Sequence, residues 1–85
     1  MKKVREEFDA LVIMYRTLRD SDEIVNSDMF DSITFDIDGY CEEFERAEMD
    51  GDESGAQCLV SLLRKQVGYV STYVIALKNI NFRYV

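Results

Sequence analysis

Histidine, tryptophan and proline are all absent from this 85-residue sequence. Without histidine the chain has no imidazole to act as a catalytic base or metal ligand, which excludes histidine-containing triads, zincin sites and Cys-His nucleophiles. Without proline, and with only four glycines, the chain contains few forced breaks, so its helices can run long. No apolar run approaches the ~18 uncharged residues that a membrane span requires.

Cysteine is also scarce, because Cys41 and Cys58 are the only two and they do not form a CxxC motif. Isolated thiols in apolar-periodic stretches are typical of buried free cysteines in a reducing compartment. Residues 1–7 lack the apolar segment of a signal peptide. The sequence therefore predicts a single helical domain over residues 1–85, located in the cytoplasm, with no membrane partner.

Charge is unevenly distributed along the chain. Residues 20–53 hold 14 carboxylates against the single Arg46, a net charge of -13, whereas residues 54–85 hold four basic side chains and no acid. Residues 1–19 carry a net charge of +2, so the whole chain carries -7. Such an acidic segment disfavours direct binding to nucleic acid or anionic lipid and favours partners with a basic surface.

Two segments have clear helical periodicity. Over residues 3–19, apolar side chains follow the 4-3 spacing of one helix face: Val4, Phe8, Leu11, Tyr15 and Leu18. Over residues 54–80, a second such stripe is formed by Val60, Leu63, Val67, Val70, Val74 and Leu77. Ser54 and Gln57 have the spacing of a capping box, which predicts that this last helix begins at residue 54.

The middle segment is more ambiguous. Residues 27–49 are predicted to form a helix with the apolar stripe Phe30, Ile33, Ile37, Cys41, Phe44 and Ala47, although residues 32–37 also alternate as a strand would. Gly39 is the weak point, because glycine inside a helix costs roughly 1 kcal/mol relative to alanine. We predict an all-α protein, a three-helix up-down-up bundle with a long C-terminal helix. The alternative is an α+β fold with strands at 32–37, 69–77 and 80–85.

Projection of the middle helix predicts an acidic stripe that points away from the core. It consists of Asp28, Asp31, Phe35, Asp38, Glu42 and Glu45. Successive positions of this stripe lie about 7 Å or less apart along a helix, an interval comparable to that of phosphates in a nucleic-acid backbone. We expect this stripe to bind a basic surface of a partner protein, with Phe35 as its apolar anchor.

Two alternative functions stay open at this stage. Ile13 and Ile75 are predicted to project outward from the first and last helices, which favours a structural homo-oligomer in which the charge only solubilises. The second alternative is a calcium-responsive module, because residues 50–55 match four positions of a calcium-binding EF-hand loop. Ser61 stands where this loop requires glutamate.

The sequence predicts no enzyme, no cofactor and no metal site. No phosphate-binding loop, nucleophile elbow or ligand set accompanies the carboxylates, so the runs of acid are interpreted as solvated helix faces. The leading hypothesis is a non-enzymatic protein-binding module. It would inhibit a nucleic-acid-handling protein, or bind to it as a mimic of nucleic acid.

Overall fold

The computed structural model describes the backbone of residues 1–26 and 35–84, and the side chains of 1–26 and 35–80. Every element in these residues is a helix: α1 spans Lys2–Arg19, α2 spans Asp22–Val25, α3 spans Ile37–Met49 and α4 spans Glu53–Tyr84. The all-α prediction is therefore confirmed. The strands of the α+β alternative are wrong for residues 69–77 and 80–84, which are helical, and residues 32–34 lie outside the described part.

Helix α1 follows the predicted boundaries and buries the predicted face. Val4, Phe8, Leu11 and Tyr15 are buried, and Leu18 packs against the core from its edge. After α1 the chain turns at Ser21, whose hydroxyl donates to the Leu18 carbonyl at 2.7 Å. The single turn of α2 follows and places Ile24 in the core, fully buried.

Helix α3 begins at Ile37 rather than at the predicted residue 27. Residues 27–34 of the predicted helix, with Phe30 and Ile33 of its stripe, lie outside the described residues. Asp36 caps the helix with non-helical backbone angles, and its carboxylate accepts a hydrogen bond from the Gly39 amide at 2.9 Å. Aspartate is a strong N-cap because it satisfies an amide that the first turn leaves unpaired. Gly39 therefore lies in the first turn beside this cap instead of in the middle of a long helix.

The connection from α3 to α4 is a tight turn at Gly51. Gly51 has φ of +67°, a left-handed conformation that glycine adopts without steric cost. The Asp52 carboxylate then accepts a hydrogen bond from the Gly55 amide at 2.9 Å and caps the start of α4. The helix begins at Glu53, one residue before the predicted start, and runs four residues past the predicted end at residue 80.

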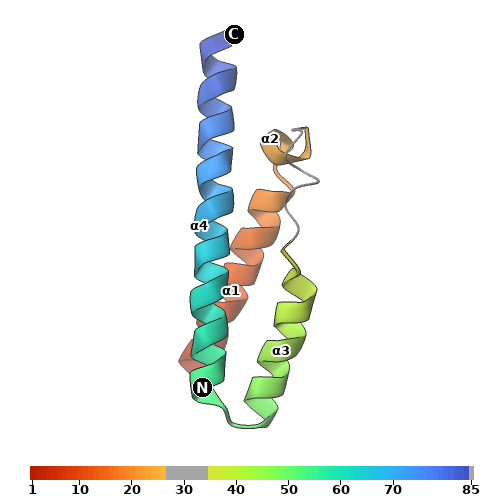
Figure 1. Cartoon of the computed structure of the whole chain (residues 1–85), viewed down its shortest axis with the longest axis vertical. Helices are drawn as coiled ribbons and strands as arrows, with labels where there is room; N and C mark the ends of the chain where they lie inside the picture. The colour runs from red at the N-terminus through yellow and green to blue at the C-terminus, as the bar shows by residue number, and fades with distance from the viewer. Residues whose placement is uncertain (27–34, 85) are drawn as a thin grey trace.

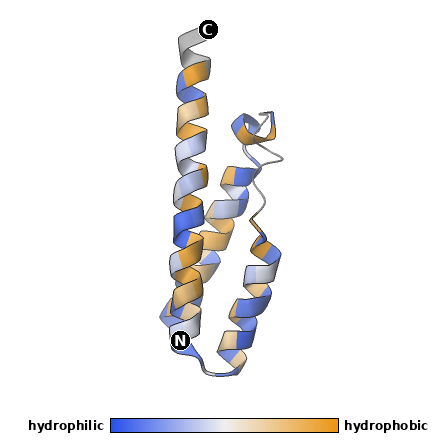
Figure 2. Ribbon diagram, viewed as in Figure 1, coloured by the Kyte–Doolittle hydropathy of each residue, from blue (hydrophilic) through white to orange (hydrophobic). Residues whose placement is uncertain are grey.

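The helices pack so that α4 lies against both α1 and α3, with α3 running opposite to the other two (Figure 1). The rings of Phe8 and Phe44 stack with centroids 4.1 Å apart and join α1 to α3. Such an aromatic pair contributes roughly 0.5–1.5 kcal/mol beyond the area it buries. The predicted α4 stripe is buried from Val60 to Val74, and Figure 2 shows apolar residues on the facing sides of α1 and α4.

Helix α4 is much longer than the helices that cover it. At 1.5 Å per residue it is about 48 Å long, against about 27 Å for α1. The longest dimension of the molecule, 51 Å, is set by this helix. Its C-terminal turns extend past the other helices (Figure 1), and Ile80 in this part of α4 is 50 % exposed.

Tyr15 is the largest fully buried side chain, and its hydroxyl has no hydrogen-bond partner within the described part of the chain. Its phenyl ring packs edge-on against Phe35 at 5.2 Å. Burial raises the pKa of Tyr15 above the usual 10.0, although the positive charge of Arg19 opposes the shift. The ring therefore stabilises the core, whereas no hydrogen bond offsets the free energy that the hydroxyl loses on leaving water.

We predict that Tyr15→Phe raises the free energy of unfolding by about 1 kcal/mol, because removing an unpaired buried hydroxyl removes its desolvation cost. The raised pKa keeps the Tyr15 phenol neutral in the folded state, whereas the unfolded chain has the usual pKa of 10.0. The free energy of unfolding of the wild type therefore falls as pH rises above 10.0, and Tyr15→Phe should not show this part of the decrease. Urea denaturation at pH 7 and above pH 10 measures both effects. A Tyr15→Phe variant less stable than wild type would contradict the prediction.

Candidate functional site

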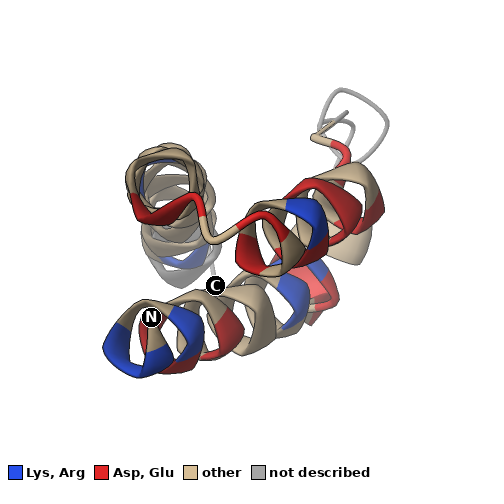
Figure 3. Ribbon diagram, turned by 90° about the horizontal axis from the view of Figure 1, so that it is seen from below, with Lys and Arg blue, Asp and Glu red and all other residues tan. Residues whose placement is uncertain are grey.

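The predicted acidic stripe is only partly within the described structure. Asp28 and Asp31 lie outside the described residues. Asp38, Glu42 and Glu45 all lie on α3, and all three are exposed. They follow one another at i, i+4 and i+7, so they share one flank of the helix. Figure 3 shows the concentration of acidic residues on α3 and on the turn that follows it.

Phe35 does not project outward, so this part of the predicted site is wrong. The side chain is partly buried and packs against the core. Its ring lies between two tyrosines, edge-on to Tyr15 at 5.2 Å and to Tyr40 at 4.5 Å. The prediction assumed that residue 35 belongs to the same helix as Asp38, but Phe35 precedes the cap of α3 and has no helical orientation. It serves as a core residue at this end of the molecule.

Two arginines of α1 form ion pairs with α3. Arg16 lies 3.1 Å from the Asp38 carboxylate, and Arg5 lies 2.8 Å from Glu48. The Arg5 guanidinium also lies 5.5 Å from the centre of the Phe44 ring. Asp38 is 84 % exposed, and an ion pair this open contributes at most about 1 kcal/mol. Part of the acid on α3 is therefore paired within the molecule, but these pairs remain accessible to solvent.

Glu42 and Glu45 differ from Asp38 because neither forms an ion pair with any residue that the structure describes. Both are exposed on the flank of α3 that faces away from α4. Their charges are thus available to an external partner without first breaking an internal contact.

An open cleft of about 370 Å³ separates α1 from this flank of α3. It is lined by Arg5, Phe8, Asp9, Val12, Ile13, Cys41 and Glu45. Ile13 is 66 % exposed at its edge, so a large apolar side chain stands beside the unpaired carboxylate of Glu45. The sequence assigned these two residues to different functions, because their proximity depends on how α1 packs against α3. Ile75, the other predicted self-association residue, is exposed on α4.

Cys41 lies half-buried in this cleft. Burial is the main reason that its pKa is raised. Arg16 opposes the shift, while the carboxylates of Asp38 and Glu45 add to it. The thiol is consequently held in its neutral, less nucleophilic form. Cys58 is exposed on α4, which contradicts the expectation that both thiols are buried.

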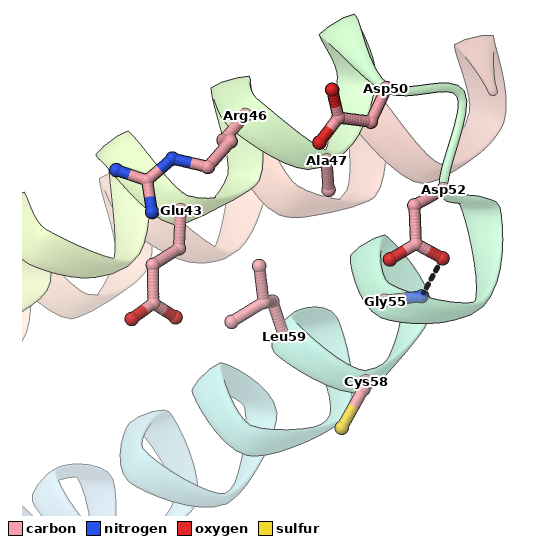
Figure 4. Close-up of a pocket in the computed structure, with 8 residues that line it drawn as sticks. All are labelled: Glu43, Arg46, Ala47, Asp50, Asp52, Gly55, Cys58 and Leu59. Carbon is pink, nitrogen blue, oxygen red and sulfur yellow. Dashed lines mark hydrogen bonds between the residues drawn. The ribbon is translucent and has the colours of Figure 1, made fainter.

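A second pocket, of about 300 Å³, opens between α3 and the beginning of α4 (Figure 4). It is lined by Glu43, Arg46, Ala47, Asp50, Asp52, Gly55, Cys58 and Leu59. The predicted calcium loop lies here, and the cap on α4 already uses the Asp52 carboxylate. Within residues 1–26 and 35–84, no cluster of three or more metal-ligating side chains occurs. Calcium binding stays an untested alternative.

None of the helices in the described part of the chain combines the length and apolar character that a membrane span requires. No protein-family model matches the chain, and no curated protein and no solved structure matches it significantly. A function therefore has to be inferred from the geometry of the chain itself.

We predict that Cys58 reacts with iodoacetamide at least about tenfold faster than Cys41, because exposure and thiolate fraction together control alkylation. The single variants Cys41→Ser and Cys58→Ser, followed by mass spectrometry, measure each thiol separately. In the Cys58→Ser background, Glu45→Gln should increase the reactivity of Cys41, since it removes a negative charge that raises the pKa. Equal rates for the two thiols in the folded protein would contradict the half-buried position of Cys41.

Proposed function

We propose that the chain is a non-enzymatic protein-binding module, an up-down-up helical bundle that acts in the cytoplasm and binds a basic surface on another protein. The recognition surface is the α1–α3 cleft and the acidic flank beside it. The observation that carries the proposal is that Glu42 and Glu45 are exposed and unpaired within the described structure, next to the exposed Ile13.

Charge gives this surface its selectivity. Residues 20–53 carry a net charge of -13, so the segment that contains α3 attracts cationic partners and repels nucleic acid. Long-range attraction of this kind accelerates encounter more than it strengthens the final complex. Asp38, Glu42 and Glu45 supply the charges on the described part of the flank, and Asp28 and Asp31 add charge in the same segment of the sequence.

An apolar anchor complements the charge. Phe35 was predicted for this role, but it is partly buried against the core. Ile13 is instead the large, exposed apolar side chain at the edge of the cleft. A desolvated apolar residue surrounded by polar groups is the usual composition of an interface hot spot. Ile13 therefore takes the role of anchor in the proposal, with the carboxylates as its rim.

The spacing of the carboxylates favours a partner that normally binds nucleic acid. Successive carboxylates on this flank rise by about 6 Å and about 4.5 Å along α3. A basic groove that accepts phosphates at similar intervals can accept these carboxylates as well. We accordingly propose that the chain inhibits a nucleic-acid-binding protein, or occupies its basic groove as a mimic of nucleic acid.

We predict that Glu42→Lys with Glu45→Lys slows association with the partner at least about tenfold and weakens its dependence on ionic strength. The partner is first captured from the host, purified, and rebound in a surface plasmon resonance experiment at low and high salt. The control pair, Glu43→Lys with Asp50→Lys, makes the same change in net charge on the opposite flank of α3. If both pairs slow association equally, net charge alone governs binding and the proposed surface is wrong.

We further predict that Ile13→Ala accelerates dissociation from the same purified partner while leaving the association rate within about twofold, at a cost of roughly 1–3 kcal/mol. Ile75→Ala removes an equally large and exposed side chain from α4 and is the matched control. Circular dichroism verifies that both variants fold. Faster dissociation for Ile75→Ala but not for Ile13→Ala would place the anchor on α4 instead.

A further inference from the structure

Helix α4 carries a second apolar stripe that the bundle does not cover. Its large members are Leu62, Tyr69, Tyr73 and Ile80, and all four are exposed, Tyr69 by 63 %. Gln66 and Ala76 occupy the intervening positions. The stripe is thus a 4-3-4-3-4 repeat over residues 62–80, the spacing by which two helices pack along a shared seam.

This second stripe is distinct from the one that builds the core. Three of its large members each precede a buried residue of the core stripe: Leu62 precedes Leu63, Tyr69 precedes Val70 and Tyr73 precedes Val74. At 100° per residue the two stripes are therefore separated by about 100° around α4. The fold needs only the core stripe, so four large apolar side chains in water on one helix face indicate a docking surface.

The stripe continues the groove between α3 and α4. The pocket of Figure 4 includes Leu59 and Cys58, which lie on the same side of α4 as Leu62 and one turn before it. The opposite side of α4 faces α1, since Arg64 lines a pocket with Glu7 and forms an ion pair with it. A helix docked on the stripe would therefore contact α4 directly and lie beside the outer flank of α3.

The order of residues along the stripe is symmetric about Ser71. In an antiparallel pair of α4 helices centred on this residue, Leu62 of one copy faces Ile80 of the other, and Tyr69 faces Tyr73. Gln66 of one copy likewise faces Ala76 of the other. A two-fold dimer requires such self-complementarity, because one surface must match itself after rotation.

Charge favours the same antiparallel arrangement. From residue 54 onward α4 has no acidic residue, and Arg64, Lys65 and Lys78 are exposed on it. The α3 flank beside the groove carries the acidic Glu43 and Asp50. An antiparallel pair brings the C-terminal half of each α4, which holds Lys78 and Arg83 and no acidic residue, alongside the acidic α3 of the other copy. Lys78 also lies 3.8 Å from Glu23 of its own chain. A parallel pair would instead place two acidic segments, each of net charge -13, next to each other.

We propose that the chain forms an antiparallel homodimer through the α4 stripe, centred on Ser71. The helices overlap over about 40 Å, and a seam about 10 Å wide buries roughly 400 Å² per copy between the α4 helices alone. A standard interface buries about 800 Å² per partner, so this seam corresponds to a small interface and to a weak, reversible dimer. The dimer surface is separate from the α1–α3 cleft, so it does not depend on the proposed function.

Sedimentation velocity between about 1 and 300 µM tests the proposal. The wild-type chain should shift from monomer to dimer in this range, and Tyr69→Glu with Tyr73→Glu should raise the dimer dissociation constant at least about tenfold, because the seam would bury unpaired charges. The control Ile75→Glu places charge at a residue of the same helix that is 58 % exposed but off the stripe, and it should dimerise as wild type does. Circular dichroism at low concentration verifies that all variants fold.

The orientation is tested with spin labels on single cysteines in a Cys41→Ser, Cys58→Ser background. Thr72 and Asn79 are exposed beside the seam. In the antiparallel dimer the two Thr72 labels are offset by about 3 Å along the helix axis and the two Asn79 labels by about 24 Å. Equal short distances for both labels would mean a parallel pair and overturn the proposal. A wild-type chain that stays monomeric at 300 µM, or a dimer that Ile75→Glu disrupts while the tyrosine variants do not, would also overturn it.

Discussion

The stacking of Phe8 on Phe44 is the contact on which the proposed recognition surface of this protein depends. Helix α3 has 13 residues, a length that is barely stable as an isolated helix in water. Its apolar side is narrow, with Ile37, Phe44 and Ala47 buried. The aromatic pair, with Arg5 over the Phe44 ring, fixes α3 on α1 and so determines which of its flanks faces solvent. Because Phe44 is buried on one side of α3, the flank with Asp38, Glu42 and Glu45 faces solvent.

The same constraint divides the surface of the molecule into two parts. On one side of α3 lies the cleft with Ile13 and Glu45, where charge remains unpaired within the described structure. On the other side α3 and α4 form an open groove that leads to the uncovered stripe of α4. Ile13 and Glu45 on the first surface, and Leu62, Tyr69 and Tyr73 on the second, are exposed and lie outside the buried core. Each is thus free to serve a partner, one through charge and the other through apolar packing.

Periodicity predicted the helices that carry a continuous apolar stripe and failed where a local cap determines the start of a helix. The faces of α1 and α4 were correct because one apolar residue per turn leaves few alternatives. The start of α3 was wrong because Asp36 caps a helix there, and its spacing from Gly39 recurs between Asp52 and Gly55. That repeated pattern was a usable signal in the sequence. The proximity of Ile13 to Glu45 carried no such signal, since it depends on how α1 packs against α3. The uncovered stripe on α4 was present in the sequence, but its exposure follows only from the limited reach of α1 and α3.

The central claim is that the acidic flank of α3 and the α1–α3 cleft form the recognition surface. The most direct test is amide chemical-shift mapping of the ¹⁵N-labelled chain titrated with its purified partner. The account predicts that the largest perturbations fall on residues 38–45 of α3 and around Ile13 of α1, while the amides of α4 from Tyr69 to Ile80 change little. Perturbations centred on α4, with α3 unaffected, would contradict it.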